Sequence, residues 1–315
     1  MSKSTKWVLA GSFGAFCLIS ALIGLGVTSV FYRPDFLQMN KKVQLNIKLA
    51  DRTKTTKWFG PETADWVPMS SISDYAIAAV ISSEDTSFYS HQGVDYHELK
   101  EAIKKDLKEK KWARGASTLT QQVVKNVYLT QEKTVTRKFR EILWAGELEK
   151  SLSKSQILCF YLNMAEWAPG IYGIKGAARH YFQKPAAELT AKESAFLAML
   201  LPSPWRYHIY YVTKEITPWA QKRIERILTV MNKMGYLDEN EYQGALAENL
   251  WGGLKVSGSA EEGATDGDAL PANAPVPSTS APAAPKEQVD PADLAERPGP
   301  ASMDEEPNAE DPELK

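Results

Sequence analysis

The distribution of apolar and polar positions divides the chain into three parts. Residues 7–32 contain no charged residue, and a bilayer core needs about 20 apolar residues. We therefore predict a membrane anchor there, after a short stub at residues 1–6, and the flanking charges leave its orientation open. A cleaved signal peptide is the alternative, but its apolar region would be only about 7–15 residues long. A folded domain is expected over residues 33–254, and a tail follows at 255–315.

Within the central part, the apolar period changes from two to that of a helix. Residues 42–49 alternate strictly, which predicts a strand. After them the pattern is helical, and Ser, Thr or Asp with Glu three residues later marks several helix starts. The expected fold is mainly α. The helices are expected at about 72–83, from Asp95 onward, 118–129, 134–151, 153–167, 190–202, 216–234 and 238–250.

Composition changes this picture at the C-terminus. Residues 255–315 hold four basic and fourteen acidic residues and no aromatic one, so we interpret them as a disordered tail. The whole chain carries a net charge of −2, so residues 1–254 are basic, at about +8. A basic domain suits nucleic acid, phospholipid headgroups or a phosphorylated substrate. The lysines at 100–111 form either a solvated helix face or a contact with anionic lipid.

Two adjacent carboxylates, Glu84 and Asp85, lie where a buried helix is expected to end. Partial burial and the negative end of the helix dipole both raise the pKa of a carboxyl group there. Glu84 is therefore a candidate catalytic base, and an ordinary solvated carboxylate is the alternative. His91 follows in a loop, and the four histidines lack the spacing of metal ligands.

A second set of candidates suits a phosphate. Ser117 and Thr118 begin a helix whose face also carries Gln122 and Lys125, and helix N-termini bind anions. An ordinary polar surface stripe is the alternative. Further on, Arg137 and Lys138 precede Glu141, and they are either phosphate partners or members of a surface ion pair. Ser151 and Lys154 match S-x-x-K, but S-D-N and K-T-G are absent from the sequence.

Four ordered motifs resemble the peptidoglycan glycosyltransferases related to class A penicillin-binding proteins. Residues 84–95 match E-D-x-x-F-x-x-H-x-G-x-D, and residues 137–141 match R-K-x-x-E. Between and after them lie G-A-S-T-L-T-Q-Q-V-V-K-N at 115–126 and I-L-C-F-Y-L-N at 157–163. The resemblance covers about residues 60–240. The A-E-W at 165–167 is most similar to the monofunctional members.

This resemblance implies a lysozyme-like helical domain with a small membrane-associated lobe, after one transmembrane helix. It implies that lipid II is polymerised into glycan strands with inversion and with release of polyprenyl pyrophosphate. The enzyme would sit in the cytoplasmic (inner) membrane as a single-pass protein, with residues 1–6 as a cytoplasmic stub and its catalytic domain on the periplasmic or outer face. Glu84 would be the base and Glu141 the second essential carboxylate. The expected substrate-binding residues are Asp85, Phe88, His91, Ser117, Thr118, Gln122, Lys125, Arg137 and Lys138.

The expected partners are lipid II, the lipid-linked growing glycan, membrane lipids and other cell-wall synthesis proteins, and nucleic acid is not expected. A divalent cation, Mg²⁺ or Mn²⁺, stays open, with Asp85 as its candidate ligand. The chain departs from the family pattern at Ala116 and Cys159. Two alternative functions are a lysozyme-like enzyme that cleaves glycan and a catalytically silent membrane scaffold.

Overall fold

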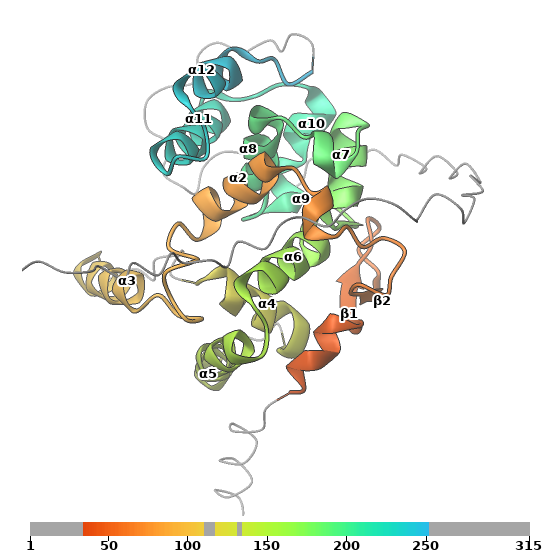
Figure 1. Cartoon of the computed structure of the whole chain (residues 1–315), viewed down its shortest axis with the longest axis vertical. Coiled ribbons are helices and arrows are strands. Elements are labelled where there is room, and N and C mark those ends of the chain that lie inside the picture. Colours follow the sequence, from red (N-terminus) through yellow and green to blue (C-terminus); the bar gives the residue numbers. More distant parts are fainter. Residues whose placement is uncertain (1–33, 110–116, 131–133, 252–315) are drawn as a thin grey trace, which may run out of the picture. The chain divides into compact units, whose positions relative to one another are not determined.

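The computed structural model describes residues 34–109, 117–130 and 134–251. The predicted anchor and tail lie outside these residues. The described part is mainly helical (Figure 1), as the sequence predicts. Its helices are α2 (Asp74–Glu84), α3 (Tyr96–Glu109), α4 (Leu119–Tyr128), α5 (Val135–Ser151), α6 (Lys154–Met164), α7 (Ile174–Phe182), α8 (Ala191–Leu200), α9 (Pro204–Tyr207), α10 (Ile209–Thr213), α11 (Pro218–Lys233) and α12 (Glu239–Ala247).

Helices α2 and α8 lie in the core and pack on each other. All ten residues of α8 are buried, so it has no solvent face. Helix α11 covers both, and it buries Ala220, Ile224, Ile227, Leu228 and Met231, which recur at helical spacing. Helix α12 packs on α11, while α4 packs on α5 and α6. Both groups can be followed in Figure 1.

The predicted helix starts are built by side-chain caps. The Thr118 hydroxyl accepts a hydrogen bond from the Gln121 amide, and the Gln121 side chain accepts one from the Thr118 amide. The same reciprocal box begins α6 at Ser153, α8 at Thr190 and α12 at Asp238. Because each box satisfies two otherwise unpaired N–H groups, it fixes where the helix begins.

The structure also contains short strands and 3-10 turns. Strand β1 (Val43–Lys48) confirms the predicted alternation, and it pairs antiparallel with β2 (Lys54–Phe59). The other pair is β3 (Glu166–Ala168) with β4 (Ile171–Tyr172). The 3-10 turns are η1 (Phe36–Asn40), η2 (Met69–Ser71) and η3 (Ala186–Glu188).

Two predicted helix ends are wrong by three residues. The helix expected to run to Trp167 ends at Met164, and the one expected to run to Leu250 ends at Ala247. At the first end, the Asn163 side chain is hydrogen-bonded to both backbone groups of Val67, and Ala165 accepts a hydrogen bond from the Gly173 amide. These bonds turn the chain into β3. The bonds to Val67 join residues 96 positions apart, so no local sequence pattern indicates them.

Candidate active site

Glu84 is the last residue of α2, and its carboxylate is held by a neighbouring helix. Gln122 Nε2 of α4 donates a hydrogen bond to Glu84 Oε2 at 2.9 Å, and Ser83 Oγ lies 3.4 Å from Glu84 Oε1. Burial raises the pKa of Glu84, while the Gln122 hydrogen bond and the positive charge of Arg223 oppose that rise. The net direction is upward, as the sequence predicts, so Glu84 is a stronger proton acceptor than an exposed glutamate.

The orientation of the Gln122 side-chain amide is fixed by one hydrogen bond at its nitrogen and another at its oxygen. A carboxylate only accepts hydrogen bonds, so the amide nitrogen of Gln122 must face Glu84. Its oxygen then accepts a hydrogen bond from the Tyr161 hydroxyl at 3.3 Å. Tyr161 is buried in α6, and burial together with the nearby Glu84 charge raises its pKa well above the ordinary value. A neutral phenol is therefore present to hold the amide.

The Asp85 side chain mainly holds neighbouring elements of the fold together. Its side chain is 3% exposed. Asp85 Oδ2 accepts a hydrogen bond from the Leu119 amide at 2.9 Å, and both oxygens lie 3.1 Å from His91 Nε2. Ser87 Oγ adds a contact of 3.4 Å to Oδ1. Asp85 thus joins the end of α2 to the first turn of α4.

This arrangement does not fit Asp85 as a metal ligand, because both of its oxygens already accept protein hydrogen bonds. Over the described residues there is also no cluster of three or more His, Cys, Asp or Glu side chains suited to a metal ion. Phe88 is fully buried and His91 faces Asp85, so both support the loop after α2. We see no geometry in which Phe88 would touch a ligand.

Glu141 lies at the centre of a second, cationic cluster. Its side chain is 2% exposed and pairs with Arg137 Nη1 at 2.6 Å and with Lys138 Nζ. Lys138 Nζ also donates to Ser117 Oγ at 2.9 Å. Glu141 therefore holds two cations in place and serves as a support for positive charge in this cluster.

Lys125 lies near the same cluster. Burial lowers its pKa, Glu141 opposes that change, and the charges of Arg137 and Lys138 lower the pKa further. Three cations therefore surround one carboxylate, which leaves a net charge of about +2. Arg137 Nε is buried without a hydrogen-bond partner among the described residues. An excess of partly exposed positive charge with a spare donor suits an anionic group such as a phosphate.

A pocket of about 370 Å3 opens beside Glu84. It brings together four of the predicted residues, Glu84, Asp85, Ser117 and Thr118, but its lining does not include Lys125, Arg137, Lys138 or Glu141. Those four form the cationic cluster instead, and Gln122 and Lys125 of α4 reach toward Glu84. The predicted residues are therefore divided between two neighbouring places.

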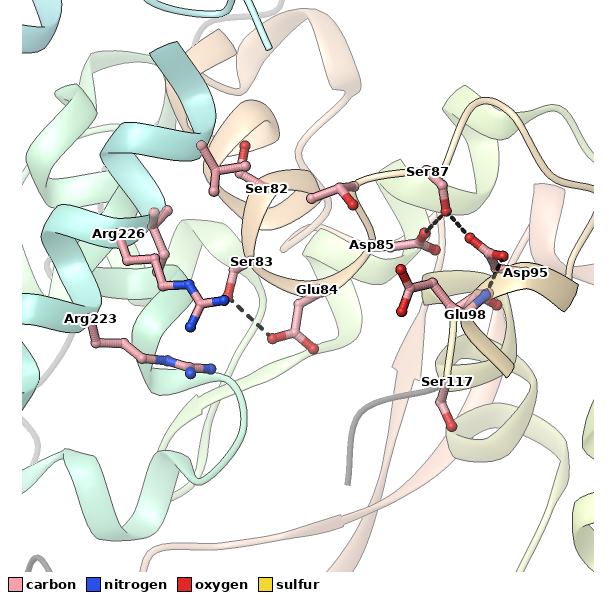
Figure 2. A pocket seen from close by; sticks show the side chains of 14 residues that line it. Ser82, Ser83, Glu84, Asp85, Ser87, Asp95, Glu98, Ser117, Arg223 and Arg226 are labelled. Carbon is pink, nitrogen blue, oxygen red and sulfur yellow. Dashed lines mark hydrogen bonds between the residues drawn. The ribbon is translucent and has the colours of Figure 1, made fainter. Parts of the chain in front are cut away.

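Both arginines of the pocket lining were missed by the sequence analysis. Figure 2 shows Arg223 and Arg226 reaching from α11 toward Ser83 and Glu84. They lie three residues apart, and Val230, another lining residue, continues the same helix face. That spacing was a usable signal, but only the packing of α11 on α2 shows that this face meets Glu84. Tyr161 was missed as well. It lies in the I-L-C-F-Y-L-N motif at 157–163, to which no site role was assigned.

Known proteins were compared with the chain. The sequence model of a family described as transglycosylase matches residues 52–234. A biosynthetic peptidoglycan transglycosylase of Nitrosomonas eutropha is 44% identical over 164 residues, which cover 52% of this chain and 66% of that protein. One from Aeromonas hydrophila is 41% identical over 177 residues, which cover 56% of this chain and 73% of that protein.

Among solved structures, penicillin-binding protein 1A of Haemophilus influenzae aligns with a TM-score of 0.33 and 18% identity. The alignment covers 68% of this chain and 22% of that one. Within the described residues, no helix is long and apolar enough to cross a membrane.

Proposed function

Because the chain belongs to the transglycosylase family, we propose that it is a peptidoglycan glycosyltransferase that polymerises lipid II into glycan strands for the cell wall. The family match spans more than half of the chain, and the relatives named above carry the name biosynthetic peptidoglycan transglycosylase. The observation that carries the mechanism is the buried Glu84, with a raised pKa, at the edge of a pocket.

In the proposed reaction, Glu84 accepts the proton of the sugar 4-hydroxyl of an incoming lipid II. The hydroxyl oxygen forms a bond to the anomeric carbon of the lipid-linked chain, and the bond from that carbon to the pyrophosphate oxygen breaks. Polyprenyl pyrophosphate leaves with the bonding electron pair, and the anomeric configuration inverts. Gln122 holds the carboxylate in place at 2.9 Å, which keeps the base within reach of its proton.

The cationic cluster would receive the leaving group. Negative charge builds up on the pyrophosphate as the bond breaks, and fixed positive groups stabilise such a transition state. Arg137 and Lys138 are already held in place by Glu141 and Ser117, and Lys125 lies near enough for their charges to act on it, so little rearrangement is needed. We assign Glu141 the role of holding these cations, and Asp85 and His91 the role of placing α4. Ser117 lines the pocket and also binds Lys138 of the cluster, and Thr118 lines the pocket beside it.

The envelope setting is part of the proposal. Residues 7–32 would anchor the chain in the cytoplasmic membrane, with the catalytic domain on the outer face, where lipid II is presented. A lysozyme-like fold with a small membrane-associated lobe is the expectation from the family. The uncharged run at 7–32 and the basic balance of the domain support this arrangement, since a positive surface is attracted to anionic headgroups.

The test is polymerisation of purified lipid II by the full chain and by Glu84→Gln, with products separated by size. Gln keeps the size and the hydrogen bond to Gln122 but cannot take the proton. Long glycan from the parent and a loss of at least about a hundredfold in the variant support the proposal. Shortening of preformed glycan would indicate the hydrolase, and an inactive parent would indicate the scaffold.

A further inference from the structure

A polar cluster outside the lining of the pocket beside Glu84 is made of Thr120, Glu149, Lys154 and His91. Thr120 is in the first turn of α4, Glu149 near the end of α5, and Lys154 is the first residue of α6. The side chains of Glu149 and His91 are 6% and 7% exposed. Within the described part of the chain, the pocket lining includes neither Glu149 nor Lys154.

Glu149 is the centre of this cluster. Its Oε1 accepts a hydrogen bond from Thr120 Oγ1 at 2.5 Å and one from Lys154 Nζ at 2.7 Å. Lys154 Nζ also lies 3.5 Å from His91 Nδ1 and 4.5 Å from the centre of the Phe88 ring. The cluster therefore links α4, the junction of α5 and α6, and the loop that follows Glu84.

The first turn of α4 is consequently held at two adjacent residues. The Leu119 amide donates to Asp85, and the Thr120 hydroxyl donates to Glu149. His91 connects the two carboxylates, because its Nε2 faces Asp85 and its Nδ1 lies 4.0 Å from Glu149 Oε1. Gln122, which donates to Glu84, is two residues further along the same helix. A shift of this turn would move Gln122 away from Glu84.

We propose that Glu149 and Lys154 are positioning residues for the reaction: they hold the first turn of α4 so that Gln122 meets Glu84. The inference rests on the proposed role of Glu84 as the base. It gives a purpose to two charges that touch no ligand site. A buried ion pair contributes little net stability compared with apolar residues of the same size, so geometric placement is the function that this pair serves.

A displaced α4 would change the pKa of Glu84, and the size of that change depends on the other groups around the carboxylate. Lys125 of α4 and Arg223 of α11 face Glu84 with positive charge, Tyr161 of α6 is a neutral phenol, and Ser83 is the neighbouring hydroxyl. Asp85 follows in the chain, where it is paired with His91. If Gln122 withdraws, burial is opposed less strongly and the pKa of Glu84 rises further.

The sharpest variant is Thr120→Val, because it removes only the hydroxyl from a fully buried side chain of nearly the same shape. Glu149→Leu removes the acceptor itself. Glu149→Gln and Thr120→Ser keep the hydrogen-bonding atoms, so they should keep α4 placed as in the parent. Lys150→Met is the matched control, since Lys150 forms an exposed ion pair with Glu147 on the same helix.

Two measurements on the full chain separate placement from stability. The first is the pH dependence of kcat with lipid II, whose acid limb should move up by about one pH unit in Thr120→Val and Glu149→Leu. The second is hydrogen exchange of the Leu119 amide, which should accelerate in the same variants. Both should remain at parent values in Lys150→Met and return toward them in Thr120→Ser and Glu149→Gln.

Unchanged exchange and an unchanged acid limb in Thr120→Val would overturn the inference, and so would a lower melting temperature as the only effect. The exchange measurement needs no turnover. If Glu84→Gln kept full polymerisation, the proposed base would be wrong, and the exchange of Leu119 would still report on the placement of α4. The two failures are therefore distinguishable.

Discussion

Glu84 is balanced between two opposing influences. Burial raises its pKa, while Gln122, Arg223 and Lys125 lower it. A general base needs both the influence that raises its pKa and those that lower it. A pKa that is too high leaves the group protonated at the working pH, and one that is too low weakens it as a base. The neighbours therefore set the pH at which this enzyme begins to work.

Arg223 offers a direct test of this balance. Replacing it in Arg223→Met removes a positive charge that favours the ionised form of Glu84, so the pKa of Glu84 should rise. The acid limb of the kcat profile should then move to higher pH. Lys222→Met is the control, because Lys222 is the exposed neighbour on α11. An equal shift in both variants would show that Arg223 acts only through the overall charge.

The same burial has a cost for stability. The pKa of Glu84 is higher in the folded chain than in the unfolded one, so the folded state binds more protons and stability falls as pH rises above the ordinary value of 4.5. Glu84→Gln removes that loss, because a neutral amide needs no desolvation of charge. We expect its melting temperature to exceed that of the parent at pH 7 and to approach it at pH 4.

Differential scanning calorimetry of both proteins at the two pH values checks this expectation. Glu101→Gln is the control, because Glu101 is exposed and pairs with Lys104 at the surface. A Glu84→Gln variant that is less stable than the parent at pH 7 would contradict the expected penalty. It would show that the carboxylate contributes more through its hydrogen bonds than it loses through burial.

For single residues, the sequence could identify the candidates but not the contacts that they make with one another. Glu84 and the face of Thr118, Gln122 and Lys125 follow from a helix end and from helical spacing. Gln122 is held by Tyr161 of α6, and the charge of Arg223 on α11 acts on Glu84. These two residues lie 77 and 139 positions after Glu84. No local pattern encodes such contacts, because they depend on how the helices pack.

At the scale of elements, local signals predicted starts better than ends. The caps at Thr134, Ser153, Thr190 and Asp238 are short-range, and all four were found where expected. Strand β1 alternates between buried and exposed residues, but five residues of β2 are exposed or half-buried, so β2 has no alternation to read. It is a strand because β1 supplies its hydrogen bonds. Helix α7 was missed inside a glycine-rich stretch.

Gly93 shows how one element fixes the approach of another. Its φ is +85°, and a Cβ atom there would lie 2.6 Å from the backbone of Ala145 in α5. Its carbonyl also accepts the Thr118 hydroxyl at 2.7 Å. Gly93→Ala should therefore separate the loop from α5 and α4, with a loss of about 3 kcal/mol or more in the free energy of unfolding.

Urea unfolding of the variant measures that loss, and polymerisation should fall with it because Thr118 lies in the pocket wall. The matched control is Gly244→Ala in α12, where φ is ordinary and a Cβ atom would meet nothing within 4 Å. That change should stabilise the protein by about 0.5–1 kcal/mol. Equal effects at the two positions would contradict the close approach at Gly93.

At the scale of the whole molecule, charge is separated along the chain. The described residues belong to a basic part, and the acidic residues 255–315 lie beyond the family match, which ends at 234. The sequence predicts that the acidic tail takes no part in the chemistry. Every group assigned a role in the mechanism lies between Glu84 and Arg223.

Deleting residues 256–315 should leave polymerisation in detergent micelles within about twofold of the parent, because no catalytic group is lost. The deletion changes the net charge from −2 to a positive value, and a positive chain is attracted to an anionic surface within a Debye length. The shortened chain should therefore bind vesicles containing anionic lipid more tightly at low salt, and the difference should vanish at high salt. Vesicle flotation over a salt series measures this.

Two outcomes would contradict this expectation. A shortened chain with much lower kcat in detergent would show that the tail belongs to the catalytic unit. Tighter vesicle binding that persists at high salt would assign the effect to something other than charge.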